Sequence, residues 1–394
     1  MTISFCLWGF FRPERRDAAH NLIYSANKTE GHFPQHRIVW ALMVLGFVAH
    51  SASAQSADPL LPGLKPPDVS LDWKRLVGIY EYYNISGDSG HERNVSKQTV
   101  IFLERDQHLF LQRQNDTKKL EEIREKNETV LIADSKGRTY PYAEHHNAAG
   151  NVTSLLYLKE YFVRVDGGAN PGRPFQFTPA HPILEHRNEA LTASPPAENR
   201  TFRKPDLVEL APLDSGIHLD IRYATSNDFL GAPVYTEARA FLQSPAAEAL
   251  LRVLHKLRPL GYGLLIYDGY RPWYVTKIFW DATPQEGKIF VADPSQGSRH
   301  NRGCAVDLTL YDLKTGEPVE MTGGYDEMSP RSFPNYPGGT SLQRWNRDLL
   351  RRAMESEGFT VYESEWWHFD YKDWHEYGIL NIPFEKLGIG SATK

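Results

Sequence analysis

Two short motifs in the C-terminal part of the chain constrain its fold more than any other feature. The first, SRHNRGCAVDLTLYD (298–312), places His300 and Asp307 seven residues apart, with Asp307 in an apolar run typical of a buried strand. The second, ESEWWH (363–368), holds Glu365 and His368 in an aromatic, β-rich segment. A surface loop followed by a strand would explain the first motif alone. The two motifs together supply two imidazoles and two carboxylates, and this combination favours a metal site.

The donor types suggest a division of roles within such a site. A catalytic zinc ion needs three protein ligands with N or O donors and one open position for water, and His300, Asp307 and His368 fit that number. Glu365 lies three residues before His368, where it can act as the general base on water without ligating the metal. Residues three apart in a regular strand point to opposite faces, so we expect a bulge at the two tryptophans between them.

The segments around the motifs predict an α+β unit over residues 205–394. SPAAEALLRVLHKLRPLG (244–261) and SLQRWNRDLLRRAMESEG (341–358) each carry apolar residues at helical spacing. YGLLIYD (262–268) is typical of a buried strand and leads into DGYRPW, which contains Arg271. We therefore expect a mixed or antiparallel sheet flanked by helices, with these candidate residues on one sheet.

The sequence before this unit divides into three further parts. Residues 55–74 are rich in proline and predict a linker. Residues 75–166 contain short β-branched and aromatic runs separated by turn residues, which predict a small all-β domain of unknown role. A second segment rich in proline and glycine, 167–204, predicts another linker. Since every candidate catalytic residue lies after residue 220, we expect residues 205–394 to hydrolyse substrate alone.

Residues 1–54 predict an N-terminal extension with an export signal. IVWALMVLGFVA (38–49) is an apolar run that follows His36 and Arg37, and Ala52-Ser53-Ala54 matches a signal-peptidase site. The run is short for a final transmembrane anchor, so we expect no stable membrane anchor after cleavage. The protein is then expected in the periplasm or outside the cell.

Composition narrows the remaining classes of protein. The net charge is −5 and no long basic stripe occurs, so nucleic acid is not an expected partner. The chain has two cysteines, Cys6 and Cys304, and no C-x-x-C pair, which argues against a thiolate zinc cluster or a disulfide framework. Nothing in the sequence indicates an oligomeric state.

The C-terminal half also resembles a known family, the D-alanyl-D-alanine dipeptidases found in vancomycin resistance, within the zinc D,D-peptidases. The resemblance runs from about Gly216 to Phe384 and is carried by IRYATSNDFLGAPV (221–234), GYGLLIYDGYRP (261–272), SRHNRGCAVDLTLYDLKTGEPVEM (298–321), YDEMSPRS (325–332) and EWWHF (365–369). It differs from the family pattern at Cys304, where a small residue is usual, and in EMSPRSFPNYPGG (327–339), which is less similar.

The resemblance implies a role for each matching residue. It implies one zinc ion in the catalytic domain, a transition-state arginine at Arg271, and substrate contacts from Tyr223, Ser298 and Asp326. It places the zinc ligands and the base on the four residues already identified, His300, Asp307, His368 and Glu365.

The implied reaction is hydrolysis of the dipeptide D-Ala-D-Ala, in cell-wall peptide turnover or glycopeptide resistance. Two alternatives stay open: a D,D-carboxypeptidase that acts on longer stem peptides, and a metal-bearing wall-binding protein without catalysis. A carboxypeptidase would need an open groove, and Asp326 beside a substrate amine argues against one. The presence of both Glu365 and Arg271 argues against a loss of catalysis.

Overall fold

The computed structural model describes residues 58–84, 97–113, 120–126, 129–133, 139–146, 152–157, 160–165 and 176–388. The export signal expected within residues 1–54 lies outside the described residues. In the described part of the chain, no helix combines the length and the apolar character needed to cross a membrane.

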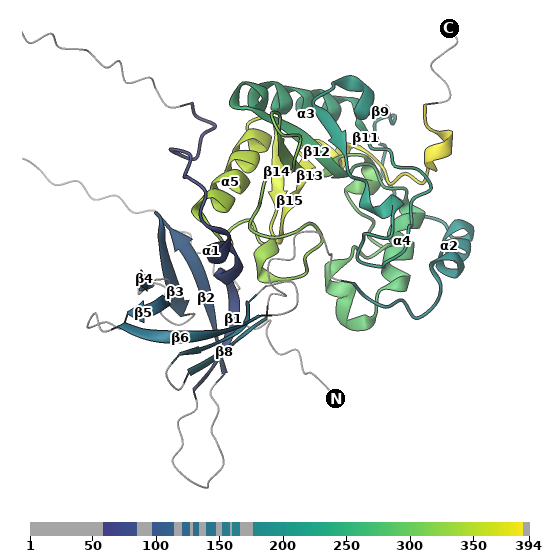
Figure 1. The fold of residues 1–394 in the computed structure, drawn as a ribbon. Coiled ribbons are helices and arrows are strands. Elements are labelled where there is room, and N and C mark those ends of the chain that lie inside the picture. Colours follow the sequence, from purple (N-terminus) through teal and green to yellow (C-terminus); the bar gives the residue numbers. More distant parts are fainter. Residues whose placement is uncertain are drawn as a thin grey trace, which may run out of the picture. The chain divides into compact units, whose positions relative to one another are not determined.

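The N-terminal part of the described chain is an eight-stranded closed barrel (Figure 1). It follows a short helix, α1 (Leu71–Leu76). Each strand pairs antiparallel with the next, and β1 closes the barrel by pairing with β8. Leu76, Tyr80, Phe102 and Phe162 are buried together in the barrel core. The strands are β1 (Gly78–Asn84), β2 (Lys97–Arg105), β3 (His108–Arg113), β4 (Leu120–Lys126), β5 (Thr129–Ala133), β6 (Thr139–His146), β7 (Val152–Tyr157) and β8 (Glu160–Arg164).

The C-terminal part is built on a five-stranded mixed sheet with the order β10-β12-β13-β15-β14. β10 runs parallel to β12, and the other neighbours are antiparallel. A separate two-stranded sheet pairs β11 with β9. These strands are β9 (Leu207–Glu209), β10 (Ile217–Leu219), β11 (Phe241–Gln243), β12 (Tyr262–Asp268), β13 (Ala305–Asp312), β14 (Phe359–Tyr362) and β15 (Glu365–Tyr371). The mixed α/β architecture expected from the sequence is confirmed at this level.

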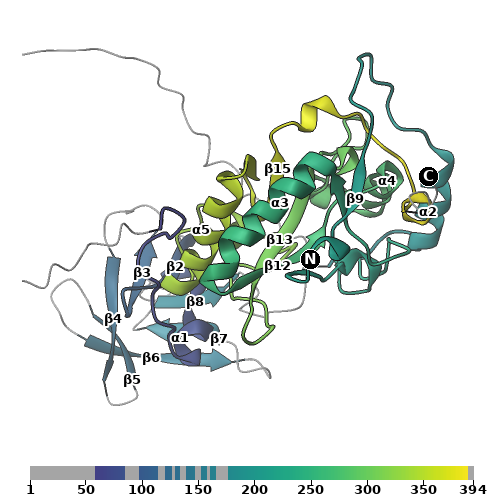
Figure 2. The ribbon, with the colours of Figure 1, turned by 90° about the horizontal axis from the view of Figure 1, so that it is seen from above.

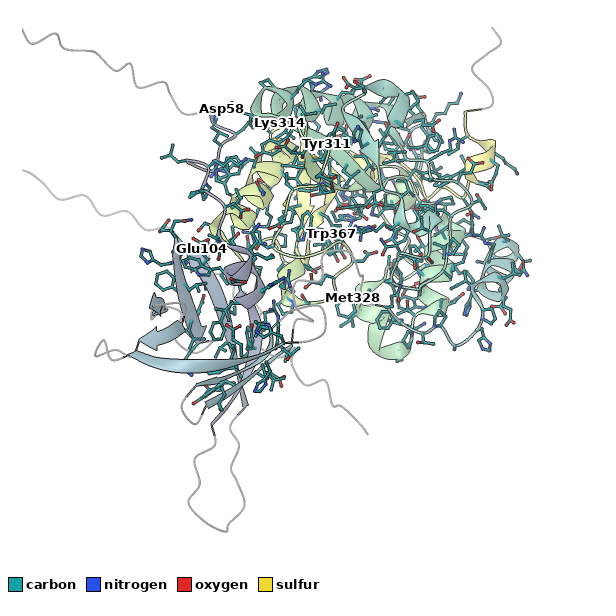
Figure 3. All side chains as sticks on the ribbon, viewed as in Figure 1. Asp58, Glu104, Tyr311, Lys314, Met328 and Trp367 are labelled. Carbon is teal, nitrogen blue, oxygen red and sulfur yellow. The ribbon has the colours of Figure 1, made fainter. Side chains whose placement is uncertain are left out.

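Two long helices pack side by side on the sheet, α3 (Ser244–Leu257) and α5 (Ser341–Glu355) (Figure 2). A capping box fixes the start of α5. The Thr340 side chain accepts from the backbone N–H of Gln343, and the Gln343 side chain accepts from the backbone N–H of Thr340. α3 ends through a short 3₁₀ turn at Gly261, whose φ of +88° is left-handed and therefore favours glycine. Aliphatic and aromatic side chains from the sheet and both helices fill the core between them (Figure 3).

Part of the segment expected to be a linker, residues 167–204, is helical. Residues 183–192, assigned to a linker, form helix α2 (Ile183–Thr192), which packs against α4 (Trp273–Ala282) and buries Ala190 completely. Glu198 accepts from Arg302 and from the backbone N–H of Ile379. The sequence prediction missed this because α2 has a weakly amphipathic pattern and lies in a segment of turn residues.

Candidate metal centre and active site

Asp307 and His368 are brought together by the pairing of β13 with β15. They are directly opposite each other in the antiparallel register, which places their side chains on the same face of the sheet. His300 comes from a 3₁₀ turn (His300–Arg302) just before β13, and this turn is held by a bond from the Arg271 N–H to the His300 carbonyl. All three side chains are buried.

The three side chains aim one atom each at a common point. His300 Nε2 lies 3.1 Å from His368 Nδ1 and 3.5 Å from Asp307 Oδ1, and His368 Nδ1 lies 3.1 Å from Asp307 Oδ1. Ligands at metal bonds of about 2.0–2.1 Å in a tetrahedron are about 3.3 Å apart, which matches this triangle. Asp307 Oδ1 is buried and has no hydrogen-bond partner among the described residues. Two imidazoles and a carboxylate with an unsatisfied buried oxygen therefore fit a zinc-type cation.

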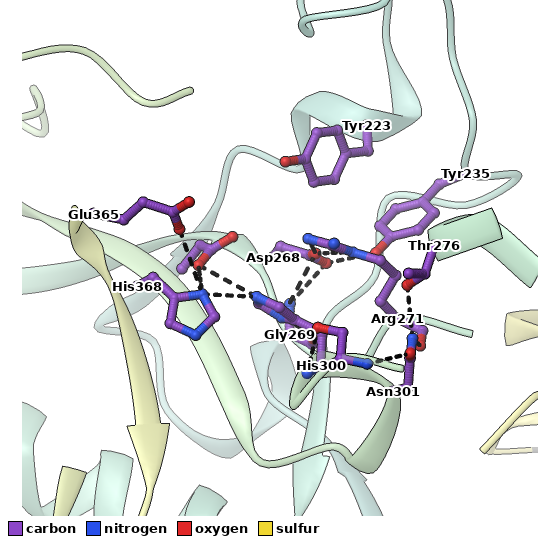
Figure 4. Close-up of polar contacts among 12 residues, drawn as sticks. Tyr223, Tyr235, Asp268, Gly269, Arg271, Thr276, His300, Asn301, Glu365 and His368 are labelled. Carbon is purple, nitrogen blue, oxygen red and sulfur yellow. Dashed lines mark hydrogen bonds and ion pairs between the residues drawn. The ribbon is translucent and has the colours of Figure 1, made fainter. Parts of the chain in front are cut away.

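The other ring nitrogen of each histidine is held by a polar partner, which Figure 4 shows for His300 and Gly269. His300 Nδ1 lies 2.7 Å from the carbonyl oxygen of Gly269, so it donates there and leaves Nε2 unprotonated. His368 Nε2 lies 2.9 Å from Asp370 Oδ1, which leaves Nδ1 facing the triangle. The two rings are thus oriented with their basic nitrogens toward the same point.

The electrostatics of this cluster follow from its burial and its carboxylates. Burial works to lower the pKa of His368, but the nearby carboxylates of Asp307 and Asp370 raise it to about 10. Burial raises the pKa of Asp307, but His300 and His368 hold it well below its usual range. The cluster thus stabilises a carboxylate at position 307 and favours positive charge beside it.

β15 carries the irregularity that the sequence spacing required. Along β14, Val361 and Tyr362 are consecutive, but their partners on β15 are Phe369 and Glu365. The residues between these partners form a bulge that includes both tryptophans, as predicted. The bulge lets Glu365 share the face of His368, and Glu365 Oε2 lies 3.7 Å from His368 Nδ1. Burial raises the pKa of Glu365, which favours its action as a proton acceptor.

Arg271 lies at the end of β12 in a buried ion pair with Asp268. Its Nε and one terminal nitrogen donate to Asp268 Oδ2 at 2.9 and 2.7 Å. Asp268 Oδ1 accepts from the Tyr235 hydroxyl at 2.6 Å and from the Gly269 N–H at 2.8 Å. Burial opposes the charge of Arg271, yet Asp268 raises the pKa of Arg271 well above its usual value. Arg271 is therefore a fixed cation at this site.

Tyr223, which is buried, and Asp326, which is half-buried, form a second pair in the cluster. The Tyr223 hydroxyl donates to Asp326 Oδ2 at 2.9 Å, and its ring centroid lies 5.4 Å from the Arg271 guanidinium. Asp326 has a left-handed backbone with φ of +55°, which is uncommon for a residue other than glycine. Burial, and then the nearby charge of Asp307, raise the pKa of Asp326 well above its usual value. A cation near Asp326 would offset this cost.

Ser298 is placed differently from the other predicted site residues. Its hydroxyl oxygen accepts from the backbone N–H of His300 at 3.2 Å, and its own N–H donates to Asn301 Oδ1. In this structure it shapes the turn that presents His300.

The structure adds three residues that the sequence analysis missed. Asp268 holds Arg271, Asp370 holds His368, and the Tyr325 hydroxyl donates to Asp307 Oδ2 at 3.1 Å. Asp268 and Asp370 stand three residues before Arg271 and two residues after His368, so their position in the motifs was an available signal. Tyr325 carried no such signal, because its approach depends on the fold of a loop.

Comparison with known proteins places the C-terminal part of the chain in a family. A family model described as D-ala-D-ala dipeptidase matches residues 203–384, a region that excludes the barrel. A D-alanyl-D-alanine dipeptidase of Escherichia coli (strain K12) is 35% identical over 179 residues, which cover 45% of this chain and 91% of that protein. Enzymes of the same name from Streptomyces coelicolor and Enterococcus faecalis are 37% and 38% identical, and the matches cover 92% and 85% of their lengths. The chain therefore belongs to the metallopeptidases, and within them to the D-alanyl-D-alanine dipeptidase family.

Proposed function

We propose that the protein hydrolyses D-Ala-D-Ala to two molecules of D-alanine and that it does so with one zinc ion held by His300, Asp307 and His368. The observation that carries this proposal is the triangle of donor atoms at 3.1, 3.1 and 3.5 Å, with a buried Asp307 oxygen that has no other partner among the described residues. The names of the family relatives support the substrate.

Glu365 is the proposed general base. Zinc, when bound, would supply a Lewis acid that polarises the scissile carbonyl and makes water more acidic. Glu365 is placed beside the donor triangle, and its raised pKa allows it to accept a proton from the attacking water and return it to the leaving amine. Glu365 itself stays outside the set of donor atoms that form the triangle.

Arg271 is the proposed stabiliser of negative charge in the transition state. The ion pair with Asp268 uses Nε and one terminal nitrogen, and these bonds orient the guanidinium. A buried guanidinium interacts strongly with an oxyanion because little water screens it. Asp268 is thus a positioning residue that acts through Arg271.

Asp326, Tyr223 and Ser298 are the proposed contacts to the ends of the substrate. Asp326 is half-buried with a raised pKa, so the ammonium group of a dipeptide would supply its missing counter-charge. The Tyr223 hydroxyl fixes this carboxyl, and the Ser298 hydroxyl has a proton that it can donate to substrate. A half-buried acid matched to a free amine selects for dipeptides over longer chains.

A comparison of Glu365→Gln with Glu363→Gln tests the proposal. Glu363 is exposed two residues earlier in the chain, so its change is a matched control for charge and position. We expect Glu365→Gln to keep stoichiometric zinc and to lose at least about a hundredfold in kcat, because proton transfer is lost. Zinc content and D-Ala-D-Ala hydrolysis would be measured on the same samples. Wild-type turnover in a zinc-loaded Glu365→Gln protein would exclude Glu365 as the base.

A substrate comparison distinguishes the alternatives. We expect D-Ala-D-Ala to be cleaved much faster than a pentapeptide that ends in D-Ala-D-Ala, since only the dipeptide offers a free amine to Asp326. Equal rates would favour a D,D-carboxypeptidase, and zinc binding without cleavage of either substrate would favour a wall-binding protein. We further propose that the enzyme is exported and acts in cell-wall peptide turnover or glycopeptide resistance, which the predicted export signal supports.

A further inference from the structure

Helix α5 carries a row of arginines beside its apolar face. Arg344, Arg347 and Arg351 are three and four residues apart, so they lie along one side of the helix, with Arg352 next to them. The apolar face of α5 packs into the core through Leu349, Leu350, Ala353 and Met354. Arg347 is buried and donates to the Tyr336 carbonyl oxygen at 2.8 Å, whereas Arg351 and Arg352 lie nearer the surface.

These arginines border a cavity of about 420 Å³. A fifth arginine, Arg105, lines this cavity from the end of strand β2. The end of β2 is held to α5, because the buried carboxylate of Glu104 accepts from the backbone N–H of Ser341 at 2.6 Å. The lining residues are Arg105, Pro334, Asn335, Tyr336, Pro337, Arg344, Arg347, Asp348, Arg351, Arg352 and Glu355. None of them belongs to the His-Asp-His site.

The carboxylates at the cavity do not balance its guanidinium groups. Five arginines line it against Asp348 and Glu355, which gives a local charge of 5 − 2 = +3 in a chain whose net charge is −5. Asp348 pairs with Arg347 at 3.0 Å, and Glu355 pairs with Arg351 at 2.7 Å. This cavity therefore concentrates positive charge that the rest of the protein does not have.

The three remaining guanidinium groups lack an acidic side chain as direct partner among the described contacts. Arg352 donates to the carbonyl oxygen of Leu61. Arg344 donates to the carbonyl oxygens of Gly338, Gly339 and Glu104. The Arg105 side chain is exposed, and no bond or ion pair to it occurs among the described residues. Burial, together with the neighbouring charges of Arg105 and Arg347, lowers the pKa of Arg344 to about 10, against the opposing effect of Glu104. Bringing a negative charge into the cavity would relieve this repulsion.

We propose that this cavity binds a small multivalent oxyanion, one that carries phosphate or carboxylate groups. Guanidinium groups bind both chemistries through paired N–H donors, and several arginines around one cavity favour more than one negative charge. Asn335 and the unshared N–H groups of Arg105 and Arg351 supply further donors at the rim. The site is independent of the proposed dipeptidase activity.

The test is calorimetric titration of the zinc-loaded protein with pyrophosphate and with citrate at constant ionic strength. The variants are Arg105→Gln, Arg351→Gln and the double variant, which are expected to fold because Arg105 is exposed and the Arg351 side chain is 36% exposed. Arg252→Gln is the matched control, since that arginine is also a surface residue but pairs with Glu357 away from the cavity. We expect saturable one-site binding in the wild type, about tenfold weaker in each single variant and unchanged in Arg252→Gln.

The result also identifies the source of the anion. Tighter binding of pyrophosphate assigns the site to phosphate-bearing ligands, and tighter binding of citrate assigns it to carboxylate-bearing ligands. Anion that binds at the zinc ion instead would keep full affinity in the double variant, and that outcome overturns the proposal. Absence of saturable binding to the wild type, or an equal loss in Arg252→Gln, also overturns it.

Discussion

Asp268→Asn is the substitution for which the structure makes the sharpest prediction. Both oxygens of Asp268 act only as acceptors: Oδ1 receives N–H and O–H bonds from Gly269 and Tyr235, and Oδ2 receives two from Arg271. An asparagine in either orientation would direct its NH₂ group at one of these donor pairs. The change therefore removes the counter-charge of Arg271 and also creates a buried clash between donors.

The magnitude follows from the burial of this ion pair. The Arg271 and Asp268 side chains are 9% and 1% exposed, so the unpaired guanidinium would have little access to water. Removing one partner of such a pair costs about 3–5 kcal/mol in the free energy of unfolding. The control is Asp220→Asn, because Asp220 also pairs with an arginine but is 42% exposed, and it should cost no more than about 1 kcal/mol.

The assay is denaturant unfolding combined with hydrolysis of D-Ala-D-Ala. Arg271→Met should also destabilise the protein, and the double variant should cost less than the sum, with a coupling energy of about 1–3 kcal/mol. Both single variants and the double variant should lose turnover, because each removes or misplaces the guanidinium. If Asp268→Asn unfolds at the wild-type denaturant concentration, or keeps wild-type turnover, then Asp268 does not position Arg271.

Two further predictions concern residues outside the donor triangle. Asp370→Asn should weaken zinc affinity about 10- to 100-fold, because Asp370 orients the ring of His368. Competition with a chelator measures the zinc affinity, and an affinity equal to that of the wild type would contradict the prediction. Burial raises the pKa of Asp228 to about 6, so this carboxyl binds its proton more tightly in the folded state than in the unfolded state. The stability that this group contributes is therefore present below pH 4 and is lost as the pH rises through 6. Relative to Asp228→Asn, the wild type should lose roughly 2–3 kcal/mol of unfolding free energy between pH 4 and pH 7. Denaturant titration at each pH measures this difference. Parallel pH profiles of the two proteins would refute the raised pKa of Asp228.

The sequence located the site because its residues lie in two continuous motifs. His300, Asp307, Glu365 and His368 could be identified by donor type and spacing, and the period of a strand required the bulge that lets the last two share a face. Arg271 follows a recognisable buried strand, but its role was implied only by the family resemblance. The partners of these residues were harder to predict, because Tyr325 reaches Asp307 only through tertiary folding of a loop.

The fold around the site was less accessible to sequence reasoning. The pairing of β1 with β8 places Tyr80 opposite Arg164, although these residues lie far apart in the chain. Local sequence patterns carry no information on such closure of a barrel. Helix α2 was assigned to a linker because its apolar residues form no clear stripe. Tertiary contacts decide both features, and these contacts are not encoded in a short window of sequence.

The same contacts change the prediction for a truncated enzyme. The sequence suggested that residues 205–394 would be active alone, but such a chain lacks α2 and Glu198. Glu198 accepts from Arg302 and from the Ile379 N–H, each at 2.7 Å, and Arg302 lies in the turn that presents His300. Loss of two hydrogen bonds to a partly buried carboxylate should lower the free energy of unfolding by about 2–4 kcal/mol. Exposure of the α4 surface that α2 covers should lower it further.

We therefore expect residues 205–394 to be less stable and to bind zinc more weakly than residues 176–394, which keep α2 and Glu198. Comparison of both with residues 55–394 then gives the joint contribution of two parts: the barrel, whose Glu104 caps α5 through Ser341, and the segment before it, whose Gly63 carbonyl accepts from Trp345. Denaturant unfolding and zinc content would be measured for all three chains, and Glu198→Ala in residues 55–394 would reproduce the local part of the loss. If residues 205–394 match residues 176–394 in both measurements, then α2 and Glu198 do not support the turn that carries His300, and the boundary predicted from the sequence is the functional one.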